Sequence, residues 1–139
     1  MKVNPFKWVL WHAAYRPFFL GAASWAVFAM LMWFGVLNLG WSFPFNGVSP
    51  AIWHGHEMVY GISAAVVAGF LLTAAPKWTD TKPMAGGPLA LSFTSWLAAR
   101  ISALFGSSEL LPLTASLDLL FITSVLVGIA VPIMRLKQW

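Results

Sequence analysis

The fold is decided by residues 59–75, VYGISAAVVAGFLLTAA, a run without a single charged side chain. Such a run is typical of a helix embedded in a membrane, where ionisable groups are costly and are kept for ligands, ions or protons. Directly before it, residues 53–58, WHGHEM, carry two imidazoles and a carboxylate. This pattern predicts a metal, haem or proton site in a lipid-embedded protein. The alternative is a small hydrophobic bundle with a polar helix cap.

The composition supports the membrane interpretation. Of the 139 residues, 60% are hydrophobic and 9% are charged, whereas soluble domains carry about 25% charged residues. The length indicates one membrane domain, residues 1–139, without a separate soluble module. The net charge of +4 does not indicate nucleic-acid binding, because the basic residues form no stripe. There is no cysteine, so any metal or haem depends on His, Met, carboxylate, Tyr or backbone ligands.

Four hydrophobic segments approach the roughly 20 residues that a helix needs to cross the hydrocarbon layer. The expected fold is therefore an all-α protein with four transmembrane helices. Pro76 is expected to end the second span. The spans are predicted at about 17–39, 52–75, 88–104 and 112–134.

The basic residues predict the orientation of these spans. With an even number of spans, seven of the eight Lys and Arg residues fall on one side of the membrane. Because positive residues accumulate in cytoplasmic segments, we expect both termini to be cytoplasmic. The seven residues are Lys2, Lys7, Arg16, Lys77, Lys82, Arg135 and Lys137.

Two charged residues lie inside the last two spans. Arg100 is nine residues before Glu109, in the turn between these spans, and Asp118 is nine residues after it. At about 1.5 Å rise per helical residue, Arg100 and Asp118 should lie at similar depth and can pair. A structural ion pair is the first interpretation, and part of a pathway is the second.

Helical spacing divides the polar residues of the second span. Residues three or four apart share a face, which groups His54 with Glu57 and Met58, and His56 with Tyr60. His54 and His56 point about 200° apart at 3.6 residues per turn. We therefore expect one imidazole to be a ligand, and the other to support it or to bind a separate centre. A helix cap is the simpler alternative for His54 and Glu57.

Two further features have structural interpretations. Gly61, Ala65, Gly69 and Thr73 follow at four-residue spacing, which allows close packing of helices in lipid. His12, with Arg16, precedes the first span, nearly a membrane thickness from His54. A single haem cannot bridge His12 and His54, and an interfacial role for His12 is the alternative.

Four segments together resemble a known family. They are residues 12–20, HAAYRPFFL; residues 53–61, WHGHEMVYG; residues 68–79, AGFLLTAAPKWT; and residues 96–100, WLAAR. In this order, they resemble the motifs of the NnrS family. The resemblance implies a multi-pass protein of the bacterial inner membrane that binds haem and copper and acts in nitric oxide metabolism and nitrosative stress.

The resemblance also suggests roles for individual residues. Its implied cofactor-binding residues are histidines and one arginine, whose bidentate fork suits a haem propionate. Met58 would favour Cu(I) over harder ions. The candidates are His12, His54, His56 and Arg100 for cofactor binding, His54, His56 and Met58 for metal, and Glu57, Tyr60, Asp118 and Arg16 as supporting polar groups.

Family members are much longer, so the chain is expected to correspond to about their N-terminal third. It would then be part of a split protein, or a short relative that assembles with itself or with a partner in the lipid bilayer. Two other functions stay open: a non-catalytic membrane subunit or scaffold, and a proton or small-solute pathway through Glu57, Arg100 and Asp118. The sequence assigns no catalytic residue.

Overall fold

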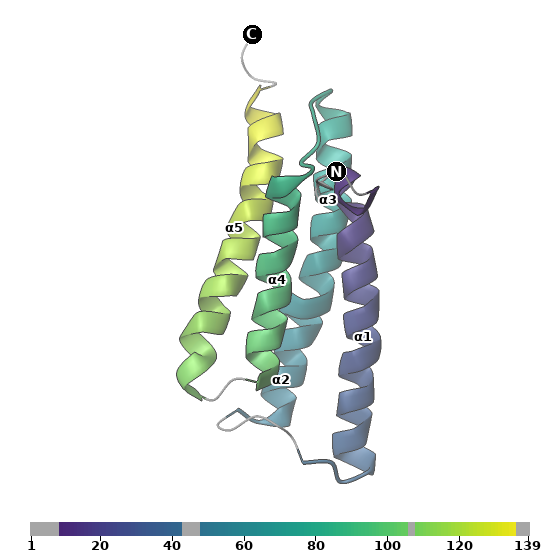
Figure 1. Ribbon diagram of the computed structural model, residues 1–139, viewed down its shortest axis with the longest axis vertical. Coiled ribbons are helices and arrows are strands. Elements are labelled where there is room, and N and C mark those ends of the chain that lie inside the picture. Colours follow the sequence, from purple (N-terminus) through teal and green to yellow (C-terminus); the bar gives the residue numbers. More distant parts are fainter. Residues whose placement is uncertain (1–8, 43–47, 106–107, 136–139) are drawn as a thin grey trace, which may run out of the picture.

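The computed structural model describes residues 9–42, 48–105 and 108–135, and in these ranges it contains helices and no strand (Figure 1). The second helix is continuous but changes its winding in the middle, where a π-helical segment, η3, separates α2 from α3. The elements are α1 (Tyr15–Asn38), α2 (Pro50–His56), η3 (Glu57–Ser63), α3 (Ala64–Trp78), α4 (Gly87–Phe105) and α5 (Leu111–Arg135).

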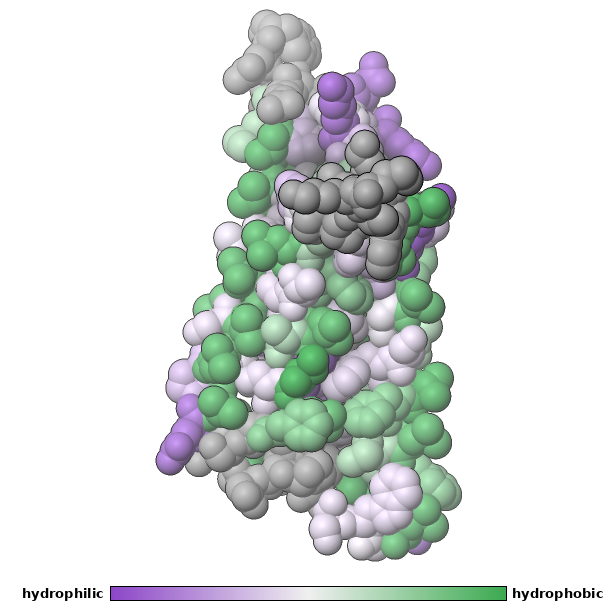
Figure 2. All heavy atoms as spheres, viewed as in Figure 1, coloured by the Kyte–Doolittle hydropathy of each residue, from purple (hydrophilic) through white to green (hydrophobic). Residues whose placement is uncertain are grey.

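Four helices are long and apolar enough to cross a membrane, which confirms the predicted all-α fold with four spans. Their outward surfaces carry many exposed large apolar side chains, and hydrophobic residues cover most of the visible length of the bundle (Figure 2). The protein is thus a multi-pass membrane protein. The spans are Tyr15–Asn38, Pro50–Trp78, Gly87–Phe105 and Leu111–Met134.

Local residues mark both ends of the second span, and the prediction for its C-terminal end differs from the structure. At its start, the Ser49 hydroxyl accepts a hydrogen bond from the Ile52 amide, and Pro50 occupies the first helical position. Pro76 was expected to end the span, but this prediction is wrong, because Pro76 lies inside α3. Pro76 removes one backbone donor but does not end the helix, which stops after Trp78, where the Thr79 hydroxyl donates to the Ala75 carbonyl.

The four spans share a buried apolar core. Its fully buried members come from every span, and the largest are Phe18, Leu72, Leu89, Trp96 and Phe121. We call this group the apolar core.

The small residues of the second span allow α1 to approach it closely. A Cβ atom on Gly69 would lie 2.9 Å from the Phe19 ring and 3.1 Å from Phe18, both on α1. Ala65 is fully buried, and the Thr73 hydroxyl accepts a hydrogen bond from the Tyr15 amide. The predicted packing stripe is therefore confirmed, and it aligns α1 with the second span.

Candidate functional site

The site begins with the π-helical segment in the second span. Segments of this kind are rare and occur frequently at functional sites. Here the Gly61 carbonyl accepts a hydrogen bond from the Trp96 indole of α4 at 2.9 Å. The Ser63 hydroxyl donates to the Met58 carbonyl, five residues earlier, at 2.8 Å. A side chain of another span thus bonds to the backbone of the altered turn.

Four ionisable side chains form a closed arrangement beside this segment. His56 Nδ1 lies 2.9 Å from Glu57 Oε1, and His56 Nε2 lies 3.1 Å from Asp118 Oδ2. Arg100 Nη2 donates to Asp118 Oδ1 at 2.5 Å, and Arg100 Nε lies 3.5 Å from Glu57 Oε2. We call these four residues the charged ring. The predicted pair of Arg100 and Asp118 is confirmed.

Three members of the ring are buried, so their charges must be balanced. Glu57 and Arg100 have no exposed surface and Asp118 is 5% exposed, whereas the His56 side chain is 30% exposed. A neutral imidazole has one N–H group, and both nitrogens donate only in the imidazolium form. His56 can therefore hydrogen-bond both carboxylates at once when it is positively charged. Two positive and two negative groups then cancel, which is how charges are tolerated in an apolar interior.

A fifth side chain completes the site. The Trp25 indole of α1 donates to Glu57 Oε2 at 2.6 Å. A Cβ atom on Gly61 would lie 2.7 Å from the same oxygen and 3.0 Å from the indole. Gly61 therefore leaves the space in which this bond forms. With Trp25 from α1, Arg100 from α4 and Asp118 from α5, every span contributes to one polar layer.

Trp25 was not among the site residues predicted from the sequence. A signal was present in the four-residue spacing of Gly21, Trp25, Ala29 and Trp33, which places them on one face of α1. In the structure, this face meets the other spans. Ala29 is fully buried, and a Cβ atom on Gly21 would lie 2.8 Å from the Phe93 ring.

The two histidines of the second span lie in separate environments. His54 stacks on Trp33 of α1, with ring centroids 4.3 Å apart and planes within 9°. Its Nδ1 atom is buried and has no hydrogen-bond partner among the described residues. His56 stacks on Tyr60 at 4.9 Å, so the predicted shared face of His56 and Tyr60 is confirmed.

His54, Glu57 and Met58 all meet the face of α1 that carries Trp25, Ala29 and Trp33, in agreement with their predicted shared face. The Glu57 carboxylate also contacts His56 and Arg100, which the spacing did not predict. Met58 is half-buried and packs beside Ala29 and Trp53.

His12 and Arg16 lie at the other end of α1. His12 is exposed and closes a short 3-10 helix, Val9–His12. The Arg16 guanidinium forms hydrogen bonds with residues close to it in the chain. It donates to the Val9 carbonyl at 2.7 Å and to the Tyr15 hydroxyl at 3.2 Å. The structure does not bring either residue to the charged ring.

These contacts show which side chains have atoms that are not hydrogen-bonded and could bind a metal or haem. Among the described residues, no group of three or more His, Asp or Glu side chains could hold a metal ion. Both nitrogens of His56 face carboxylates, whereas His54 keeps a buried nitrogen without a partner. Two buried nitrogens of Arg100, Nε and Nη1, have no hydrogen bond within the described part of the chain, although Nε lies 3.5 Å from Glu57. Of the two histidines in the second span, His54 is therefore the one with a buried nitrogen that no described residue hydrogen-bonds.

Comparison with known proteins gives one match. No curated protein and no solved structure matches the chain. A family model, described as NnrS protein, matches residues 9–139 and therefore includes the charged ring, His54 and all four spans. The chain belongs to the NnrS family.

Proposed function

We propose that this membrane protein binds haem through His54 and acts in the bacterial response to nitric oxide. Membership of the NnrS family supports a nitric oxide response protein in a membrane. The observation that supports His54 is its buried Nδ1 atom without a hydrogen-bond partner among the described residues. Imidazole is a suitable ligand for iron and copper.

The surroundings of His54 support this role. Stacking on Trp33 restricts the imidazole to one plane, and a fixed ring orientation would favour metal binding by this side chain. Bound haem would supply an iron atom that takes nitric oxide as a ligand. His56 of the charged ring lies two residues after His54, and the ring together with Trp25 connects all four spans. It would hold the position of His54 without ligating the iron.

Copper is the second cofactor of this proposal. His54 and Met58 are four residues apart, and a thioether favours Cu(I). Two ligands from one copy are few, so a second copy or a further part of a longer protein would have to add the rest. The bacterial inner membrane, with both termini in the cytoplasm, is the proposed location, supported by the distribution of basic residues.

Haem and metal analysis of the purified chain tests the proposal. We expect a Soret band after reconstitution with haem, and its loss in His54→Ala. His12→Ala is the matched control, because His12 is exposed and distant from the ring. A colourless protein that stays folded, or a His54→Ala variant with an unchanged spectrum, would contradict the proposal.

His56→Ala separates ligand binding from support. We expect this variant to lose stability, because it leaves two buried carboxylates without their imidazole partner. In the fraction that stays folded, the Soret band should remain. Loss of the band in folded His56→Ala, together with its retention in His54→Ala, would reverse the assignment.

A proton pathway is a second candidate function. Its supporting observation is that His56 lies between two carboxylates, which allows a proton to pass from Glu57 to Asp118 through the imidazole. Proton uptake by proteoliposomes that is abolished in Glu57→Gln would favour this function. A protein that binds no cofactor and moves no protons would leave a scaffold role for the ring.

A further inference from the structure

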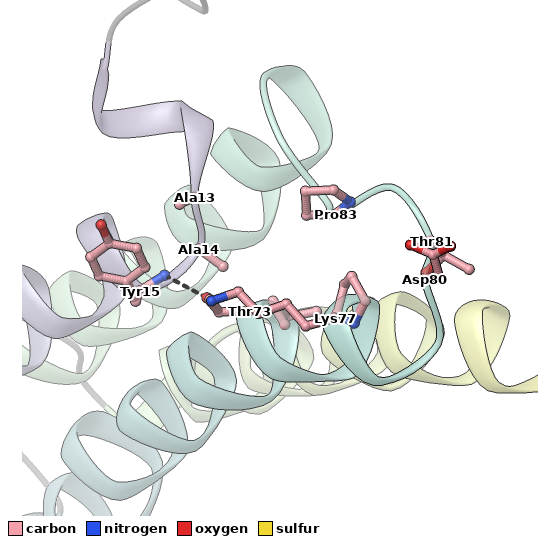
Figure 3. Close-up of a pocket in the computed structure, with 10 residues that line it drawn as sticks. Ala13, Ala14, Tyr15, Thr73, Lys77, Asp80, Thr81 and Pro83 are labelled. Atoms are coloured by element: carbon pink, nitrogen blue, oxygen red, sulfur yellow. Dashed lines mark hydrogen bonds between the residues drawn. The ribbon is translucent and has the colours of Figure 1, made fainter.

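A cavity of about 330 Å³ lies beside the start of α1 and the end of α3 (Figure 3). The segment before α1 forms one side, the loop between α3 and α4 forms the other, and the end of α3 lies between them. It is lined by Ala13, Ala14, Tyr15, Leu72, Thr73, Pro76, Lys77, Asp80, Thr81 and Pro83. The charged ring lies toward the other end of the bundle, because Arg100 is near the end of α4 and Asp118 near the start of α5.

Backbone hydrogen bonds hold the walls of this cavity in place. The Tyr15 amide donates to the Thr73 hydroxyl at 3.2 Å, across the cavity floor. The Gly86 amide donates to the Trp11 carbonyl at 2.8 Å and so ties the loop to the N-terminal segment. Within the loop, the Thr81 amide donates to the Pro76 carbonyl at 2.9 Å. These hydrogen bonds therefore fix the segments that form the cavity walls relative to one another.

The lining combines an apolar surface with two opposite charges. Lys77 and Asp80 are exposed, and neither forms an ion pair with any residue that the structure describes. Asp80 has a φ angle of 49°, a left-handed conformation that Asp tolerates better than most residues. One cation and one anion at a single cavity are complementary to a ligand that carries both charges.

The position of the cavity restricts the ligand further. It lies where the span Pro50–Trp78 ends, and hydrophilic residues gather at this end of the bundle (Figure 2). In a membrane, this is the level of the lipid headgroups. We propose that the cavity binds a zwitterionic phospholipid with a primary ammonium group, that is, a phosphoethanolamine headgroup. The proposal is independent of haem binding at His54.

Each part of this lipid has a counterpart in the cavity. The phosphate lies against the Lys77 ammonium, and the lipid ammonium donates to the Asp80 carboxylate. The start of the acyl chains lies against Ala13, Leu72 and Pro76. An anionic glycerol headgroup offers no cation to Asp80. A choline headgroup carries the same charges but has no N–H group to donate.

Lipid binding to the purified full chain in detergent tests the proposal. Native mass spectrometry would compare phosphatidylethanolamine, phosphatidylglycerol and phosphatidylcholine with identical acyl chains. We expect the ethanolamine lipid to bind tightest, by about tenfold, the scale that one charge-assisted hydrogen bond gives to a binding constant. Equal binding of the three lipids, or tighter binding of the anionic lipid, would overturn the proposal.

Charge variants locate the binding site. Lys77→Gln should weaken binding of the ethanolamine lipid about tenfold. Asp80→Asn should remove the preference for it over the anionic lipid, and asparagine tolerates the same positive φ. Lys82→Gln and Glu109→Gln are the controls, because neither residue lines the cavity. Wild-type selectivity in both cavity variants would overturn the proposal.

A steric variant leaves the charges unchanged. Ala13→Leu adds three carbon atoms to the lining and should reduce binding of all lipids with apolar chains in the cavity. All the variants should keep the haem spectrum of the wild type, which separates this test from that of the proposed function. Unchanged lipid binding in Ala13→Leu would show that the lipid binds elsewhere.

Discussion

The charged ring and the apolar core are both buried in the same four spans, but they depend on different physical effects. The apolar core packs side chains such as Phe18 and Phe121 by shape. Lipid is as apolar as these side chains, so packing rather than the hydrophobic effect stabilises them. The ring instead consists of groups that are costly to bury and that offset one another's cost. A change in the core leaves a gap, whereas a change in the ring leaves an unpaired charge.

The largest effect is expected from Arg100→Leu. This change leaves two buried carboxylates with only His56 as a cationic partner, and breaking a buried ion pair costs about 3–5 kcal/mol. Chemical unfolding of the protein in detergent, followed by circular dichroism, measures the loss. The double variant Arg100→Leu, Asp118→Leu should lose less stability, because the negative charge of Glu57 and the positive charge of His56 still balance. A double variant less stable than the single one would show that charge balance does not govern the ring.

The apolar core should respond less strongly. Phe121→Ala creates a cavity, and we expect a loss of about 2–3 kcal/mol, since little of the usual transfer free energy applies in lipid. Phe105→Ala is the control, because Phe105 is 72% exposed. The same unfolding measurement applies to both variants. A loss for Phe121→Ala larger than that for Arg100→Leu would reverse the order of the two regions.

Gly61→Ala tests the space beside the ring. The new Cβ atom would lie 2.7 Å from Glu57 Oε2 and would displace the carboxylate or the Trp25 indole. We expect a loss of about 1–2 kcal/mol from this overpacking. Gly55→Ala is a close control, because a Cβ atom at Gly55 meets no heavy atom within 4 Å. Similar thermal midpoints for the two variants would contradict the close approach.

The smallest effect is expected from Trp25→Phe. The change removes the N–H donor to Glu57 but keeps most of the ring volume, for a loss of about 1 kcal/mol. Trp33→Phe should keep its stacking on His54 and serves as the reference. Equal stability of both variants in the unfolding experiment would indicate that the Trp25 hydrogen bond does not stabilise the ring.

The features that could be predicted from the sequence are those that depend on counting residues along a helix. The four spans follow from the lengths of the apolar segments, and the pairing of Arg100 with Asp118 follows from their equal distances from Glu109. The stacking of His56 on Tyr60 follows from their four-residue spacing. These relations depend on helix length, rise and spacing, which the sequence determines locally.

The partners of Glu57 could not be predicted in this way. They include Arg100 of α4 and Trp25 of α1, and their approach depends on how the spans pack against one another. The π-helical winding could not be predicted either, because no local residue type marks it and its Gly61 carbonyl bonds to Trp96 of another span. The end of the second span was predicted wrongly, because Pro76 lacks a backbone donor but the helix continues past it to Trp78.

The π-helical segment has a further consequence for how the second span tolerates changes in length. Relative to a regular helix, such a turn holds an additional residue. Deleting one residue between Glu57 and Ser63 would restore regular winding with little change in the length of the span. It would keep Trp53 and His54 on nearly the same side of the span relative to α3, because the wide turn already absorbs the additional residue. A one-residue deletion in the regular part of the span between His54 and Trp78 would instead rotate His54 by about 100° around the helix axis and turn its imidazole away from Trp33.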